Sequence, residues 1–156
     1  MEFTPLDLGR AHILRVDPGE DVLESVHAFL EEAGIRQAVI VGGYGTLAAY
    51  HLHWVTHNRI PTENSFGRGF GGIEILAMNG LVVEGEPHIH VALATPDGAF
   101  GGHLEPGCIA YVLCEIFFVE VEGVALRRRR VPVAVEGMGE GEISRLLFGE
   151  QKEGTA

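Results

Sequence analysis

The apolar positions between residues 18 and 33 repeat with the period of an α-helix. Asp17 stands before this segment as a candidate N-cap, Pro18 suits the first helical position and Gly34 provides a left-handed stop. The segment is predicted to form one amphipathic helix, because its apolar residues fall on one side at positions 22, 23, 26, 29, 30 and 33.

Most of the remaining chain has apolar runs or two-residue alternation, which are typical of β-strands. Strands are expected at 9–16, 38–41, 50–55, 73–83, 88–94, 99–104, 109–121 and 131–135. The polar, glycine-rich segment 57–72 is expected to be a loop, and a short helix is expected over 142–148. One helix followed by mostly antiparallel strands predicts an α+β domain in which this main helix packs on one face of the sheet.

Length and composition favour a single domain. The chain has 156 residues, of which 46% are apolar, and this is enough for one core. We divide it into an N-terminal extension (1–7), a domain (8–136) and a C-terminal tail with the short helix (137–156). The sequence shows no membrane-spanning run, no signal peptide and only two cysteines, so a soluble cytoplasmic protein is expected.

The charge balance is acidic, with 22 Asp and Glu against 11 Lys and Arg and a formal charge of −11. Such a surface is repelled by phosphate backbones, which disfavours nucleic-acid binding by the surface as a whole. The basic cluster consists of Arg127, Arg128, Arg129 and Arg130. It is either an ion-pair segment, solvated or between subunits, or a phosphate-binding patch.

Histidines carry the candidate chemistry. His88 and His90 are two residues apart on a predicted strand, so both imidazoles point to the same face. If Asp97 and Gly98 form the turn of a hairpin, His103 lies diagonal to His90 on that face. A loop of different length would turn His103 to the other side.

Three neutral imidazoles without a thiolate are the ligand set of an open Zn²⁺ site, in which water or substrate takes the fourth position. Ni²⁺, Co²⁺, Fe²⁺ and Cu²⁺ remain alternatives. Glu105 and Glu115 are candidate carboxylates for orienting a ligand or transferring a proton. The bland alternative is that the histidines only bond to backbone groups or line a polar face.

His51 and His53 repeat the same spacing on another predicted strand. They form a second wall of the same pocket, a contact between subunits or, as the simplest interpretation, a partly exposed polar face. The sequence does not decide between these roles.

Several motifs together resemble the plants-and-prokaryotes-conserved (PPC) domain family, over roughly residues 8–123. The pairing of His88-Ile-His-Val91 with Gly101-Gly-His-Leu104 is the most specific part of the resemblance. The other matching segments are Gly9-Arg10, Gly19-Glu-Asp21, Gly43-x-Gly45, Glu74-Ile-Leu-Ala-Met-Asn-Gly80, Asp97-Gly98 and Glu115.

The resemblance implies an α+β domain that assembles as a homotrimer. In bacterial and archaeal members with this triad it also implies a metal, often zinc, bound through His88, His90 and His103. Plant members accompany an AT-hook of the Arg-Gly-Arg-Pro type, and this sequence has no such segment. DNA binding therefore transfers poorly to this chain.

Three functions follow as hypotheses. The first is a trimeric metal-binding protein that senses or carries a small ligand at the metal, or that serves a regulatory assembly. The second is a metal-dependent hydrolase or lyase, with metal-bound water as the nucleophile and Glu105 or Glu115 handling the proton. The third is a DNA-associated regulator without an AT-hook. The substrate, the metal and the question of catalysis stay open.

Overall fold

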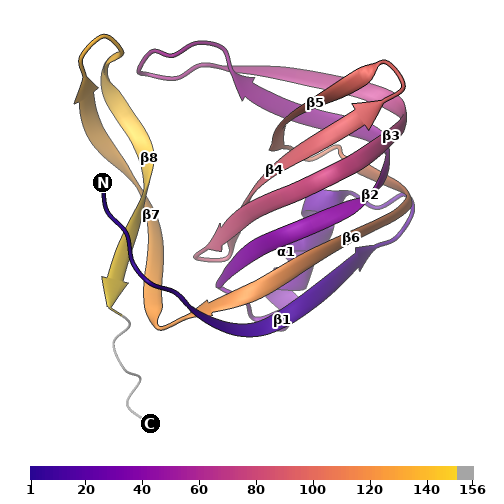
Figure 1. Cartoon of the computed structure of the whole chain (residues 1–156), viewed down its shortest axis with the longest axis horizontal. Coiled ribbons are helices and arrows are strands. Elements are labelled where there is room, and N and C mark those ends of the chain that lie inside the picture. The colour runs from indigo at the N-terminus through magenta and orange to yellow at the C-terminus, as the bar shows by residue number, and fades with distance from the viewer. Residues whose placement is uncertain (151–156) are drawn as a thin grey trace.

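The computed structural model describes residues 1–150, which form eight strands and one helix of 12 residues (Figure 1). In chain order the elements are β1 (Asp7–Val16), α1 (Val22–Ala33), β2 (Gln37–Val55), β3 (Asn64–Val83), β4 (Glu86–Thr95), β5 (Gly98–Leu104), β6 (Ile109–Glu122), β7 (Val124–Val135) and β8 (Gly139–Glu150). The predicted α+β class with a main helix is wrong, because the fold is β-rich and its helix is short. No helix among these residues is long and apolar enough to cross a membrane.

Two of the segments that were expected to be loop or helix are strands. Residues 64–72, placed in a loop by their glycines and polar side chains, extend β3 and pair with the outer half of β2. The segment 142–148, expected as a helix, lies in β8 and pairs with β7. The local sequence predicted neither of these strands. Residues 64–72 become a strand by pairing with β2, and residues 142–148 by pairing with β7, and neither pairing can be read from the segment itself.

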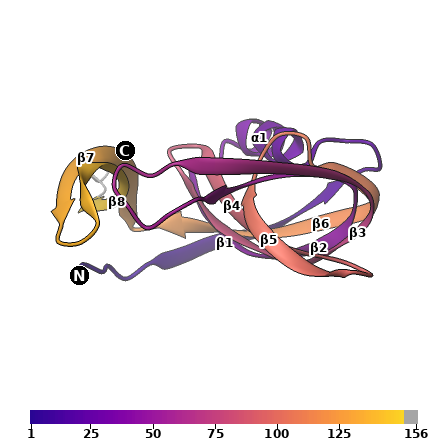
Figure 2. The same cartoon turned by 90° about the horizontal axis from the view of Figure 1, so that it is seen from above.

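The main sheet has six strands in the order β1-β6-β2-β3-β4-β5, and β5 also pairs with the outer part of β2. This second pairing joins Leu52 to Leu104 and His53 to His103. Strands β2, β3, β4 and β5 therefore close on themselves at one end of the sheet. Helix α1 lies on one side of the sheet, as Figure 2 shows.

Helix α1 is anchored by capping and by its apolar side. The carboxylate of Asp21 accepts hydrogen bonds from the backbone N–H groups of Leu23 and Glu24, so Asp21 and not Asp17 is the N-cap. Gly34 ends the helix with φ 67°, as predicted. The buried side chains Val22, Val26 and Leu30 join a core that also contains Val16, Ile40, Ile116 and Phe118.

Strands β7 and β8 form a separate two-stranded sheet, which stands apart from the main sheet in Figure 1. The predicted boundary at residue 136 falls in the turn of this hairpin, so the tail pairs with the segment before it. Near that turn the Ile60 N–H donates to the Met138 carbonyl oxygen at 2.7 Å. Pro132 lies in β7, where a strand with one free edge tolerates the missing N–H.

Candidate metal centre

The β4–β5 hairpin brings His90 and His103 directly opposite each other. Thr95 pairs with Gly98, so the two turn residues are Pro96 and Asp97 rather than the predicted Asp97 and Gly98. Each residue of β4 therefore pairs with a residue of β5 that lies two positions away from the partner expected for the predicted turn. Because side chains alternate with a period of two, this shift leaves His103 on the expected face and turns a diagonal relation into a direct one.

His88, His90 and His103 converge at this face, with one ligating atom of each lying within 4.8 Å of the others. The Nε2 atoms of His88 and His90 are 3.2 Å apart. A tetrahedral zinc ion with Zn–N bonds of about 2.0–2.1 Å separates two ligand nitrogens by about 3.3 Å. The spacing of the first two imidazoles therefore suits one shared ion.

The backbone behind the triad is fixed by core packing. Ile89 and Val91 alternate with the histidines along β4 and are buried, with 1% and 4% of their surface exposed. Their burial sets the direction in which His88 and His90 point, because neighbouring residues of a strand face opposite sides.

The protonation state of the triad suits the binding of a metal cation. Burial, followed by the nearby His88, His53 and His90, lowers the pKa of His103 from 6.5 to about 4. Burial also lowers the pKa of His88, with smaller contributions from Arg128, His90 and His53. Both rings are therefore neutral at pH 7 and keep a lone pair for a metal.

The triad lines a cavity of about 640 Å³ formed by residues of β2, β3, β4 and β5. Besides the histidines, its wall contains His53, Trp54, Val55 and Asn79 and the glycines at 101 and 102. The Trp54 indole N–H donates to the Gly101 carbonyl oxygen and fixes the ring against β5. A Cβ at Gly101 would lie 2.5 Å from the Val91 carbonyl oxygen, so glycine is needed for this close approach.

Glu105 belongs to the site and Glu115 does not. The Glu105 carboxylate lies against the imidazole of His53, with Oε1 and Nδ1 2.5 Å apart. Glu115 instead accepts a hydrogen bond from the Tyr44 hydroxyl, and among the described residues it belongs to neither histidine group. Of the two candidate carboxylates, only Glu105 is placed to act on the triad.

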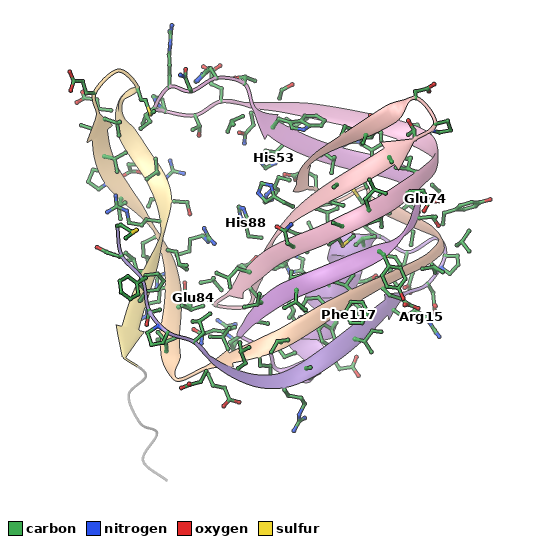
Figure 3. The ribbon with its side chains drawn as sticks, viewed as in Figure 1. Arg15, His53, Glu74, Glu84, His88 and Phe117 are labelled. Carbon is green, nitrogen blue, oxygen red and sulfur yellow. The ribbon has the colours of Figure 1, made fainter. Side chains whose placement is uncertain are left out.

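His53 is the residue whose place the sequence left undecided. It lies directly opposite His103 on the β2–β5 ladder, and the two ring centroids are 4.3 Å apart. In Figure 3 the side chains of His53 and His88 lie toward each other beside β4 and β5. The two-residue spacing of His51 and His53 was the sequence signal for a histidine-bearing strand. It could not predict that His53 lies beside the triad, because only the closure of the sheet brings β2 next to β5.

The remaining histidines have other partners. His51 is buried, and its Nδ1 lies 2.7 Å from the Pro106 carbonyl oxygen. His12 contacts Glu120 at 2.7 Å, and His57 lies 3.7 Å from Glu63. His27 is exposed on α1. None of these four is part of the histidine groups at the cavity within residues 1–150.

The arginine cluster is partly neutralised by nearby carboxylates. Arg129 makes two hydrogen bonds to Glu84, at 2.6 and 2.8 Å, and Arg130 contacts Glu142 at 3.2 Å. The bonds from Arg129 hold the pKa of Glu84 at about 2, and the backbone N–H of Arg128 adds to this effect. These contacts agree with an ion-pair segment.

The chain matches the family model described as the Plants and Prokaryotes Conserved (PCC) domain over residues 4–122. It is similar to the metal-containing protein AF0104 from Archaeoglobus fulgidus, with 27% identity and a TM-score of 0.72, over 90% of this chain and 96% of the other. It is also similar to a plant- and prokaryote-conserved (PPC) protein from Pyrococcus horikoshii, with 31% identity and a TM-score of 0.71, over 84% of this chain and 92% of the other.

A curated relative is the bifunctional protein GlmU of Synechococcus sp. (strain JA-3-3Ab), which is 29% identical over 147 residues. The match covers 91% of this chain but only 22% of that relative. The similarity therefore concerns one part of a much longer protein. The family match, in contrast, extends over most of the chain described here and confirms the resemblance seen in the sequence, so the protein belongs to the Plants and Prokaryotes Conserved domain family.

Proposed function

We propose that this protein binds a divalent transition metal, with zinc favoured, through His88, His90 and His103. The observation that carries the proposal is the convergence of three ring nitrogens within 4.8 Å on one wall of a cavity. All three donors are imidazoles, which suit zinc and later first-row metals better than Mg²⁺ or Ca²⁺. The similar protein from Archaeoglobus fulgidus is described as metal-containing, which supports the same assignment.

The proposed role is that of a metal-dependent binding or regulatory module. The cavity beside the triad has mostly apolar walls, including Trp54 and Val55, so it suits a small ligand with an apolar body. A ligand that contacts both the metal and these walls would be retained only by the metal-loaded protein. This dependence would make the site a sensor or carrier.

A homotrimer is part of the proposal. Large apolar side chains are exposed along β2, β3 and β6, among them Val41, Tyr44, Leu76, Tyr111 and Val112. Exposed apolar groups of this size on neighbouring strands are typical of a surface that is covered by another subunit. The similarity to this family favours three copies.

A metal-dependent hydrolase or lyase is the second candidate. Zinc held by three histidines supplies Lewis-acid chemistry when bound. The cavity provides room for a substrate, and Glu105 provides a carboxylate next to the histidines. The position of Glu105 favours it over Glu115 for proton transfer.

A role in binding DNA is less favoured by the charges. The formal charge is −11, and two of the four clustered arginines contact Glu84 and Glu142. Within the cluster only Arg127 and Arg128 then remain for contacts with phosphates, which supply most of the affinity for DNA.

The decisive experiment is the metal content of the purified protein compared with that of a His90→Ala variant. We expect the wild-type protein to hold metal and the variant to lose most of it while keeping its circular dichroism spectrum. His27→Ala, which removes an exposed histidine of α1, is the matched control and should keep its metal. Equal metal content in wild type and His90→Ala would overturn the assignment.

A further inference from the structure

A fourth imidazole faces the triad. His53 pairs with His103 across the β2–β5 ladder in the same way that His90 pairs with it across the β4–β5 ladder. The ring centroid of His53 lies 4.3 Å from that of His103, and the centroid of His88 lies 4.5 Å from it on a different strand. His103 is therefore the middle of a cluster to which three other strand positions contribute.

Glu105 determines which nitrogen of His53 is free. Its Oε1 lies 2.5 Å from Nδ1 of His53, and an ionised carboxylate only accepts hydrogen bonds, so Nδ1 carries a proton. The lone pair of the neutral imidazole is then on Nε2. A carboxylate that holds the non-ligating nitrogen in this way is the usual companion of a metal-binding histidine.

Glu105 is itself held in place. Its backbone N–H donates to the His51 carbonyl oxygen at 3.0 Å, which continues the pairing of β5 with β2 by one residue. The side chains of His53 and Glu105 are only 20% and 23% exposed, so water competes weakly with the contact between them. Such a pair is fixed before any ion arrives.

We propose that His53 is a fourth protein ligand of the metal held by His88, His90 and His103, and that Glu105 is its positioning residue. The inference rests on the proposed function and deepens it. A centre with four protein ligands has no vacant position, which is typical of sites that hold a metal rather than use it in catalysis. The inference therefore favours a structural or regulatory role over hydrolysis, and it removes the metal contact from the proposed ligand binding, so that a small ligand would be held by the cavity walls alone.

The competing arrangement is a second, separate ion. His53, His103 and Glu105 place ligating atoms within 4.8 Å of one another as a group of their own, which shares only His103 with the triad. A single four-histidine centre therefore requires the ring of His53 to turn toward His88 and His90 when the ion binds. Two separate ions would instead have to share His103 between them. The stoichiometry of binding separates this arrangement from a single four-histidine centre.

The test compares Zn²⁺ affinity, Zn²⁺ stoichiometry and the visible absorption of the Co²⁺ form in the wild type, His53→Ala and Glu105→Gln. We expect one Zn²⁺ per wild-type chain. Loss of the orienting carboxylate in Glu105→Gln should weaken binding by about 10–100-fold and leave the Co²⁺ spectrum similar to that of the wild type. His53→Ala should weaken binding more than Glu105→Gln and change the Co²⁺ spectrum, because a nitrogen ligand is replaced by water.

Two controls keep the test interpretable. His57→Ala removes a histidine just beyond β2 that lies near Glu63, and it should bind Zn²⁺ like the wild type. His53→Gln keeps the size of the side chain without an imidazole and replaces His53→Ala if the metal-free alanine variant fails to unfold cooperatively.

The outcomes distinguish the two proposals. Unchanged affinity and an unchanged Co²⁺ spectrum in His53→Ala, with metal lost in His90→Ala, would overturn the fourth ligand alone. Two Zn²⁺ ions per wild-type chain, with one lost in His53→Ala, would also overturn it in favour of a second site. Absence of metal binding by the wild-type protein would overturn both proposals.

Discussion

His90 and His103 face each other directly across the β4–β5 ladder, with ring centroids 5.4 Å apart and ring planes at 89°. The two rings are arranged edge to face, and one ring nitrogen of each lies within 4.8 Å of the other. The register of one hairpin thus sets the separation of two candidate ligands.

The stability of the metal-free protein should depend on pH through His103. Its pKa is about 4 in the folded protein and 6.5 in an unfolded chain, so between these values the unfolded state binds more protons. The free energy of unfolding should therefore fall as the pH decreases from 6.5 to 4. Urea unfolding in the presence of a chelator measures this dependence.

A His103→Gln variant should show a flatter pH profile over the same interval, because it lacks the titrating imidazole. His27→Gln, which alters an exposed histidine, should keep the slope of the wild type. Parallel profiles for wild type and His103→Gln would show that another group is responsible.

Replacement of Gly101 by alanine should destabilise the β4–β5 hairpin. The added Cβ would lie 2.5 Å from the backbone carbonyl oxygen of Val91, and backbone cannot move aside cheaply. Overpacking of this kind costs about 1–3 kcal/mol in the free energy of unfolding. Chemical denaturation measures the change.

Gly72→Ala is the matched control for the hairpin, because a Cβ at Gly72 meets nothing within 4 Å. The control should lie near the wild type. A Gly101→Ala variant as stable as Gly72→Ala would mean that the two strands can separate slightly without loss.

Self-association should depend on the exposed apolar surface of the main sheet. Leu76 in β3 is 58% exposed, and a charge there would have to be desolvated on assembly. Leu76→Glu should therefore convert the proposed trimer to smaller species in light scattering coupled to size-exclusion chromatography. Ala28→Glu, on the exposed side of α1, should leave the mass unchanged.

Both cysteines should resist thiol reagents in the native protein. Cys108 and Cys114 are free and fully buried, and burial raises their pKa to about 11 and about 12. The thiolate is the reactive form, so native protein should label slowly at pH 8 and rapidly in denaturant. Fast labelling of the folded protein would indicate frequent local opening around these residues.

The sequence by itself determined the local features that one segment can specify. The apolar stripe and Gly34 predicted the helix and its end, and the two-residue spacing of His88 and His90 put both rings on one face. The family followed from the same motifs. These features depend on the period of the backbone and on neighbouring residues, and both can be read along the chain.

The tertiary structure decided everything that depends on distant partners. It extended β3 through the glycine-rich segment, turned the expected tail helix into β8 and so made the fold β-rich rather than α+β. It also selected Glu105 over Glu115 and brought His53 to the triad, because β5 pairs with the outer part of β2. Pairing between strands is a property of the whole sheet, and the energy of closing it is absent from any local pattern.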